Sequence, residues 1–86
     1  IVFDQLLYLN ISFNRLKKLT NSDFNQMKSL QHLEIKSNLI ESLDRSIFIN
    51  QINLRHVDLS FNFLATLPAQ LFNQQDRTLE YLNLNN

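Results

Sequence analysis

The sequence predicts an α/β solenoid, in which short parallel strands from successive coils of the chain stack side by side. Three observations predict this fold. One pattern of apolar residues returns about every 24 residues. A triplet inside each copy alternates apolar and polar residues, as a short strand does. The complete copies also hold an Asn at one fixed position, in a chain without Gly.

The pattern runs through three complete copies and the start of a fourth. Its positions are Leu6, Leu9, Ile11, Asn14, Leu16 and Leu19; Leu30, Leu33, Ile35, Asn38, Ile40 and Leu43; Leu54, Val57, Leu59, Asn62, Leu64 and Leu67; and Leu79, Leu82 and Leu84. They divide one segment, 1–86, into the end of a preceding repeat (1–5) and repeats at 6–29, 30–53, 54–78 and 79–86. The pattern is entered midway and carries no caps, so we expect an excerpt of a longer array.

The alternating triplets predict strands over residues 8–12, 32–36, 56–60 and 81–85. Alternate residues of a strand share a face. The apolar pairs of the four strands are therefore expected to face one interior, namely Leu9/Ile11, Leu33/Ile35, Val57/Leu59 and Leu82/Leu84. Strands that follow each other by equal turns of the chain run parallel, so each coil covers the apolar side of the next.

The segments between the strands are expected to return along the outer side with irregular or 3₁₀ backbone. Phe24, Phe48 and Phe72 would form a second apolar column there. Asn21 or Ser22 is the expected cap of the first return, with Asp23 near its start. In the second repeat Gln51 replaces the apolar Met27 of the first, so Ile49 or Ile52 is expected to supply the buried methyl groups.

The repeated Asn residues are expected to form a structural ladder. Asn14, Asn38 and Asn62 would line the turn after each strand, where their amides bond backbone groups that no helix or sheet serves. Because Gly is absent, a turn that needs positive φ is expected to use Asn or Asp.

Composition excludes several classes of function. Lys plus Arg equals Asp plus Glu at 8 each, which argues against a nucleic acid or an anionic membrane as the main partner. Apolar runs stay far short of the ~18 residues that span a bilayer, so we expect no direct membrane contact in this segment. The chain has no Cys, which excludes disulfides and thiolate zinc sites within it.

The pattern L-x-x-L-x-L-x-x-N-x-L-x-x-L, with a Phe five residues later, resembles the leucine-rich repeat family over essentially the whole chain. The resemblance implies a horseshoe segment with strands on its concave side, where binding usually occurs. The 24-residue length looks most like the extracellular class of Toll-like receptor ectodomains and secreted innate-immune proteins, and the wording of repeat three looks like arthropod Toll-type ectodomains.

The polar residues of the strands would form columns on the concave face. The predicted ligand-contact residues are Tyr8, Asn10, His32, Glu34, Lys36, His56, Asp58 and Tyr81. Tyr side chains act as anchors in protein recognition, and polar groups set the register. The competing interpretation is that these are solvated strand residues without a partner.

Two clusters on this face suggest other chemistry. His32, Glu34, His56 and Asp58 would meet on adjacent strands, where they could hold zinc or titrate near neutral pH. Repeats produce such stacked pairs as a matter of course, so no metal and no cofactor is predicted. His56, Asp58 and Ser60 resemble a hydrolytic triad only by residue type. Alternate residues of one strand lie ~6.6–7 Å apart, too far for proton transfer, and no enzyme is predicted.

Asn10-Ile11-Ser12 fits the glycan acceptor rule, although a chain this rich in Asn and Ser is expected to match it once by chance. A glycan on Asn10 would obstruct its column. Phe13, Phe61 and Phe63 flank the Asn turns and are expected to pack in the core or along the side.

These expectations combine into a non-catalytic recognition module that belongs to an extracellular receptor or a secreted immune protein. Its partner would be a protein or a glycan, and dimerisation of the parent protein is left open. Two alternatives remain. One is a set of spacer repeats that bind nothing, and the other is a cytoplasmic scaffold, to which the Leu67-Pro68 return gives weak support.

Overall fold

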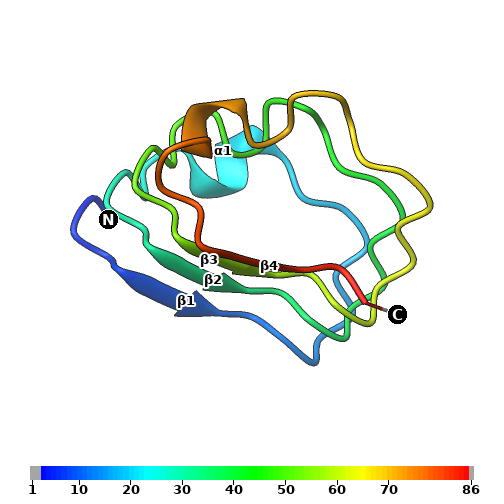
Figure 1. The fold of residues 1–86 in the computed structure, drawn as a ribbon. Helices are drawn as coiled ribbons and strands as arrows, with labels where there is room; N and C mark the ends of the chain where they lie inside the picture. The colour runs from blue at the N-terminus through cyan, green and yellow to red at the C-terminus, as the bar shows by residue number, and fades with distance from the viewer. Residues whose placement is uncertain (1–2, 86) are drawn as a thin grey trace.

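A computed structural model describes residues 3–85 of the chain. Its strands are β1 (Tyr8–Asn10), β2 (His32–Glu34), β3 (His56–Asp58) and β4 (Tyr81–Asn83). They form one parallel sheet in the order β1-β2-β3-β4, so neighbours in the chain are neighbours in space (Figure 1). The predicted parallel sheet is confirmed.

The register of the sheet follows the repeat of the sequence. Leu9 lies opposite Leu33, Leu33 opposite Val57, and Val57 opposite Leu82. The first two pairings join residues 24 apart and the third joins residues 25 apart, because one extra residue lies in the return before β4. Equivalent side chains of the four strands therefore stand in columns that cross the sheet.

Each strand is two residues shorter than the sequence predicted, although backbone bonds continue beyond it. In the first strand the amide of Ser12 donates to the side-chain oxygen of Asn10 at 3.0 Å, so it does not bond the neighbouring strand. The chain then rejoins its neighbour, since the amide of Phe13 donates to the carbonyl oxygen of Lys36 at 2.9 Å. A side chain that bonds its own backbone two residues later thus ends the regular strand.

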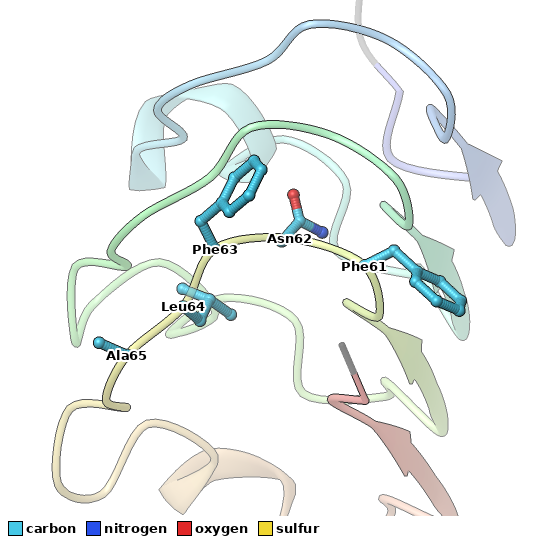
Figure 2. Close-up of a pocket in the computed structure, with 5 residues that line it drawn as sticks. All are labelled: Phe61, Asn62, Phe63, Leu64 and Ala65. Carbon is cyan, nitrogen blue, oxygen red and sulfur yellow. The ribbon is translucent and has the colours of Figure 1, made fainter.

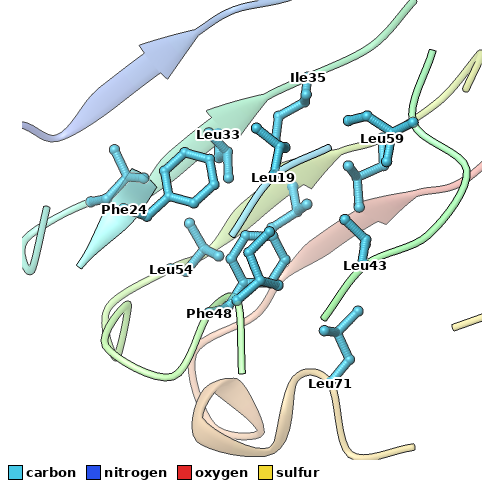
Figure 3. Packing of buried hydrophobic residues seen from close by; sticks show 13 residues of the cluster. Leu19, Phe24, Leu33, Ile35, Leu43, Phe48, Leu54, Leu59 and Leu71 are labelled. Carbon is cyan, nitrogen blue, oxygen red and sulfur yellow. The ribbon is translucent and has the colours of Figure 1, made fainter. Parts of the chain in front are cut away.

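The apolar core lies between the sheet and the returning segments (Figure 3). Leu33, Ile35 and Val57 are fully buried, as their alternation predicts. At the outer strands Leu9 is half-buried and Leu82 is exposed, because each has a neighbouring coil on one side only. Burial is therefore deepest in the middle of the stack.

The returns run on the side opposite the strands (Figure 1). They contain a short helix, α1 (Asn21–Phe24), and a 3₁₀ turn, η1 (Asn73–Gln75). The expected column of Phe rings lies here. The ring of Phe48 lies 6.2 Å from that of Phe24 and 5.5 Å from that of Phe72.

Two expectations for the returns are wrong. The cap of α1 is Thr20, one residue before Asn21, and its amide donates to Asp23 Oδ2 at 2.7 Å. The substitutes proposed for Met27, Ile49 and Ile52, are 45% and 56% exposed. Gln51 itself is buried, because its side-chain amide finds backbone oxygens to bond inside the stack.

Among residues 3–85, positive φ angles do not fall on Asn or Asp as expected. They occur at Phe13 (59°), Ser37 (58°), Phe61 (58°) and Gln70 (61°). The first three directly precede the ladder Asn residues, whose side chains are needed at the next position for their own bonds. Ladder geometry thus places the left-handed residue one position early, at some steric cost for Phe. Within residues 3–85, the helices are far too short and polar to cross a membrane.

Candidate functional site

The outward face of the sheet carries a continuous aromatic column of Tyr8, His32, His56 and Tyr81, one ring from each strand. The ring centroids lie 4.4, 3.8 and 4.2 Å apart in that order, and every pair is stacked. The two Tyr rings at the ends are about half exposed. In-register pairing produces this column, since the four residues are direct partners in the sheet.

Glu34 is the polar centre of this face. Its Oε2 accepts a hydrogen bond from the hydroxyl of Tyr8 at 2.5 Å, and its Oε1 lies 3.9 Å from Lys36 Nζ. The bond from Tyr8 lowers the pKa of the Glu34 carboxyl, with smaller help from His32 and Lys36, while partial burial opposes the shift. The same bond raises the pKa of Tyr8. Glu34 is thus held as a carboxylate and Tyr8 as a donor.

The two imidazoles differ in their surroundings. Burial lowers the pKa of His56, and the neighbouring imidazole of His32 adds to the effect, while Glu34 and Asp58 oppose it. His32 turns its Nε2 toward Glu34 Oε2 at 3.3 Å. That nitrogen is buried and has no hydrogen-bond partner within residues 3–85. One donor atom from each of His32, Glu34 and His56 lies within 4.8 Å of the others.

The next column is largely occupied by its own backbone. Asn10 and Asp58 each accept from the amide two residues later, at 3.0 Å in both cases. Asp58 is only 7% exposed and also accepts from the hydroxyl of Ser60 at 2.6 Å. Asp58 was expected to be a surface contact. Its side chain is instead buried, and its Oδ1 bonds the turn that follows the strand.

The geometry of Asp58 also bears on the triad considered from the sequence. Its carboxylate accepts directly from Ser60, whereas a catalytic triad places an imidazole between carboxylate and hydroxyl. His56 instead stacks between two rings. The arrangement of the three residues is that of a closed turn.

The expected ladder residues lie in equivalent turns. Asn38 Nδ2 donates to the carbonyl oxygens of Ile11 (3.1 Å) and Ile35 (3.2 Å), and its Oδ1 accepts from the amide of Leu16. Asn62 repeats this arrangement one coil later. Asn14 lies at the exposed end of the series. Each inner Asn therefore joins its own coil to the preceding one.

A second ladder was not predicted. Gln51 Nε2 donates to the carbonyl oxygen of Phe24 at 2.6 Å, and Gln75 Nε2 donates to those of Phe48 (2.8 Å) and Gln51 (2.7 Å). Both Gln residues are fully buried. Their spacing of 24 residues was a signal in the sequence, but the apolar Met27 at the same register of the first repeat hid it.

The expectation that Phe13, Phe61 and Phe63 are packed is wrong. They are 73%, 60% and 63% exposed. Figure 2 shows the rings of Phe61 and Phe63 on either side of Asn62, around a shallow hollow that Leu64 and Ala65 complete. The buried amide of Asn62 fixes the turn, so the residues beside it point outward.

The glycan acceptor Asn10 is exposed on the edge strand β1. Its Oδ1 holds the amide of Ser12, while the hydroxyl of Ser12 accepts from the amide of Lys36 at 3.0 Å. A glycan on the side-chain nitrogen of Asn10 would leave both bonds in place and would stand beside Tyr8.

Comparison with protein-family models and with curated proteins finds no match to this chain.

Proposed function

We propose that this chain is a non-catalytic protein-recognition module, built as a segment of a leucine-rich repeat solenoid whose strands form the contact face. The observation that carries the proposal is the aromatic column of Tyr8, His32, His56 and Tyr81. Stacked rings on a paired sheet lose little conformational freedom when a partner binds, so they suit a contact surface.

Charges beside the column support a partner with polar side chains. Lys36 lies on one side of Glu34, and its Nζ is also 5.9 Å from the ring centre of the exposed Phe13. The face thus combines exposed aromatic rings, one carboxylate and one ammonium group within a small area. Mixed groups of this kind set the orientation of a protein partner more than they set its affinity.

The parent protein is proposed to be an extracellular receptor or a secreted innate-immune protein. The support is the resemblance of the repeat pattern to the extracellular leucine-rich repeat class, together with the parallel strands and the Asn ladder. A spacer segment or a cytoplasmic scaffold would share the ladder and the core. Those alternatives do not need exposed rings on the strand face.

The proposal is tested by a triple variant of the strand face, Tyr8→Ala with Lys36→Ala and Tyr81→Ala. The longest available form of the protein is used as bait in extracellular fluid, and the amount of each co-purifying protein is measured by quantitative mass spectrometry. A matched triple variant on the return side, Asn73→Ala with Gln74→Ala and Asp76→Ala, is the control, because these residues are exposed on the opposite side.

Loss of a specific partner by about tenfold or more in the strand-face variant alone would support recognition through this face. Equal recovery of every partner by both variants, with far-UV circular dichroism unchanged, would contradict the proposal and favour the spacer. Equal loss in both variants would show that the effect is not specific to the strand face, and it would contradict the proposal too.

A further inference from the structure

The chain contains two His residues and no Cys, and the fold brings both imidazoles to neighbouring strands. They are direct partners in the sheet, with ring centroids 3.8 Å apart. Glu34 follows His32 by two residues on the same face, so its carboxylate reaches the same place. Imidazole and carboxylate together are a donor set for divalent transition metals.

We propose that His32, Glu34 and His56 form a binding site for one divalent transition-metal ion of the zinc class. One donor atom of each residue lies within 4.8 Å of the other two. Ligand atoms ~2.0–2.1 Å from a tetrahedral ion lie ~3.3–3.5 Å from each other. The donor atoms therefore have to come closer by up to about 1.4 Å, and one imidazole has also to rotate, before the three side chains close around an ion.

The environment of His32 favours this assignment over a stacked pair without function. Its Nε2 is buried and makes no well-aligned hydrogen bond in the described part of the chain, although a carboxylate oxygen of Glu34 lies close by. A buried nitrogen without a partner is costly, and coordination would satisfy it. The 3.3 Å approach of Glu34 Oε2 to that nitrogen places the carboxylate where a second ligand would stand.

Tyr8 provides the outer support that a metal-binding carboxylate usually has. Its hydroxyl donates to the Oε2 atom of Glu34, which holds the side chain in place. The positive charge of Lys36 lies 3.9 Å from Oε1 and would repel a metal ion from that oxygen. Oε2 is therefore the metal-binding oxygen of Glu34. Asp58 is not part of the set, since its oxygens are not among the donor atoms that lie within 4.8 Å of one another, and the amide and hydroxyl of Ser60 both bond its Oδ1.

The stacking of the two imidazoles sets one requirement. Their planes are only 9° apart, and a metal binds a ring nitrogen in the plane of the ring. Two parallel rings cannot both aim at one ion, so one ring must rotate about its Cβ–Cγ bond. That torsion has broad wells in His. Rotation breaks two stacking contacts, because His32 also stacks on Tyr8 and His56 also stacks on Tyr81, and these contacts are weak beside a metal–imidazole bond. All three side chains are half-buried, so a fourth position stays open to water.

The test is a calorimetric titration of the 86-residue chain with Zn²⁺ alone, near pH 7.5, in a buffer that does not bind metals. We expect one Zn²⁺ per chain. His32→Gln and His56→Gln are each expected to weaken binding at least about tenfold, since even outer-shell substitutions cost about 10–100-fold. No other His or Cys exists to replace them. Glu34→Gln is expected to weaken binding as well, whereas Glu41→Gln, the same change at an exposed site, leaves it unchanged.

Each variant is checked by far-UV circular dichroism. Imidazole ¹⁵N shifts of the wild-type chain give a second readout, in which Zn²⁺ should move the signals of both His residues together. No saturable binding by the folded wild-type chain would overturn the proposal. Binding that survives both His substitutions, or one Zn²⁺ shared by two chains, would overturn it as well.

Discussion

Asn62 reaches back across one coil of the chain, and its Nδ2 donates to the carbonyl oxygen of Ile35 at 2.9 Å. The same nitrogen bonds two carbonyl oxygens of its own coil, and Oδ1 accepts from the amide of Ile40 at 3.2 Å. Asn62 is only 4% exposed. A single side chain thus supplies the polar contacts of a buried turn.

Asn62→Asp removes the donor and keeps the acceptor. We expect a loss of at least about 2 kcal/mol in the free energy of unfolding, because three carbonyl oxygens lose their partner and a buried charge appears. Asn14→Asp is the control at the exposed end of the ladder, with an expected loss below about 1 kcal/mol. Urea unfolding near pH 7.5 measures both. Similar losses for the two variants would show that the buried contacts across coils contribute little.

Leu33 tests the apolar interior. It is fully buried in the central part of the sheet, so Leu33→Ala is expected to cost ~2–5 kcal/mol through reduced apolar packing and the cavity that remains. Leu7→Ala, at a side chain 52% exposed, should change stability by less than about 0.5 kcal/mol. Thermal or urea unfolding of both variants is the measurement, and equal effects would place the core elsewhere.

Gln75 and Gln74 form a matched pair for the second ladder. Gln75 is fully buried and donates to two backbone oxygens, whereas its neighbour Gln74 is exposed. Gln75→Ala is expected to cost ~2–4 kcal/mol, because both oxygens lose their donor inside the stack. Gln74→Ala should be neutral within about 0.5 kcal/mol. A neutral Gln75→Ala in urea unfolding would contradict a structural role for this amide.

His56 makes stability depend on pH. Its pKa is lowered in the folded chain, mainly by burial, so the unfolded chain binds more protons below about pH 6.5. Stability is therefore expected to be fully present above that pH and to fall as the pH drops from 6.5 through the lowered pKa. The lowered pKa of Glu34 acts only at more acidic pH, where carboxylates titrate.

Urea midpoints at pH 7.5 and pH 5.5 measure this effect. His56→Gln should remove most of the difference between them, while His32→Gln should retain part of it, because burial of His56 is its larger cause. A difference that persists unchanged in His56→Gln would assign the pH dependence to another group.

The sequence predicted the structure best at positions where the residue type has a single favourable environment in the fold. Leu33, Ile35 and Asn38 recur with the period of the chain, and a parallel sheet with an interior Asn ladder follows from that period. Gln51 escaped prediction because a buried amide looks like a surface residue until its backbone partners are known. Phe13, Phe61 and Phe63 were misplaced for the converse reason, since aromatic rings look like core residues.

The candidate site shows a similar division. Columns of Tyr and His could be derived from register alone, but the rotamers that stack them could not. The commitment of Asp58 to Ser60 depends on a turn whose geometry appears only in three dimensions. The burial of His32 Nε2 without a hydrogen bond likewise depends on how the neighbouring strands cover it.

The constant offset of the ladder bonds has a consequence for how such a chain can change in length. Asn38 to Ile11, Gln51 to Phe24, and Asn62 to Ile35 all span 27 residues. After duplication or deletion of a whole 24-residue block, each side-chain amide of the ladders would still face an equivalent backbone carbonyl oxygen in the adjoining turn. An indel of half that size would leave buried amides facing side chains instead of carbonyl oxygens. The fold is therefore expected to tolerate insertion or deletion of complete turns of the chain, and small changes such as the 25-residue step before β4 lie in the outer return.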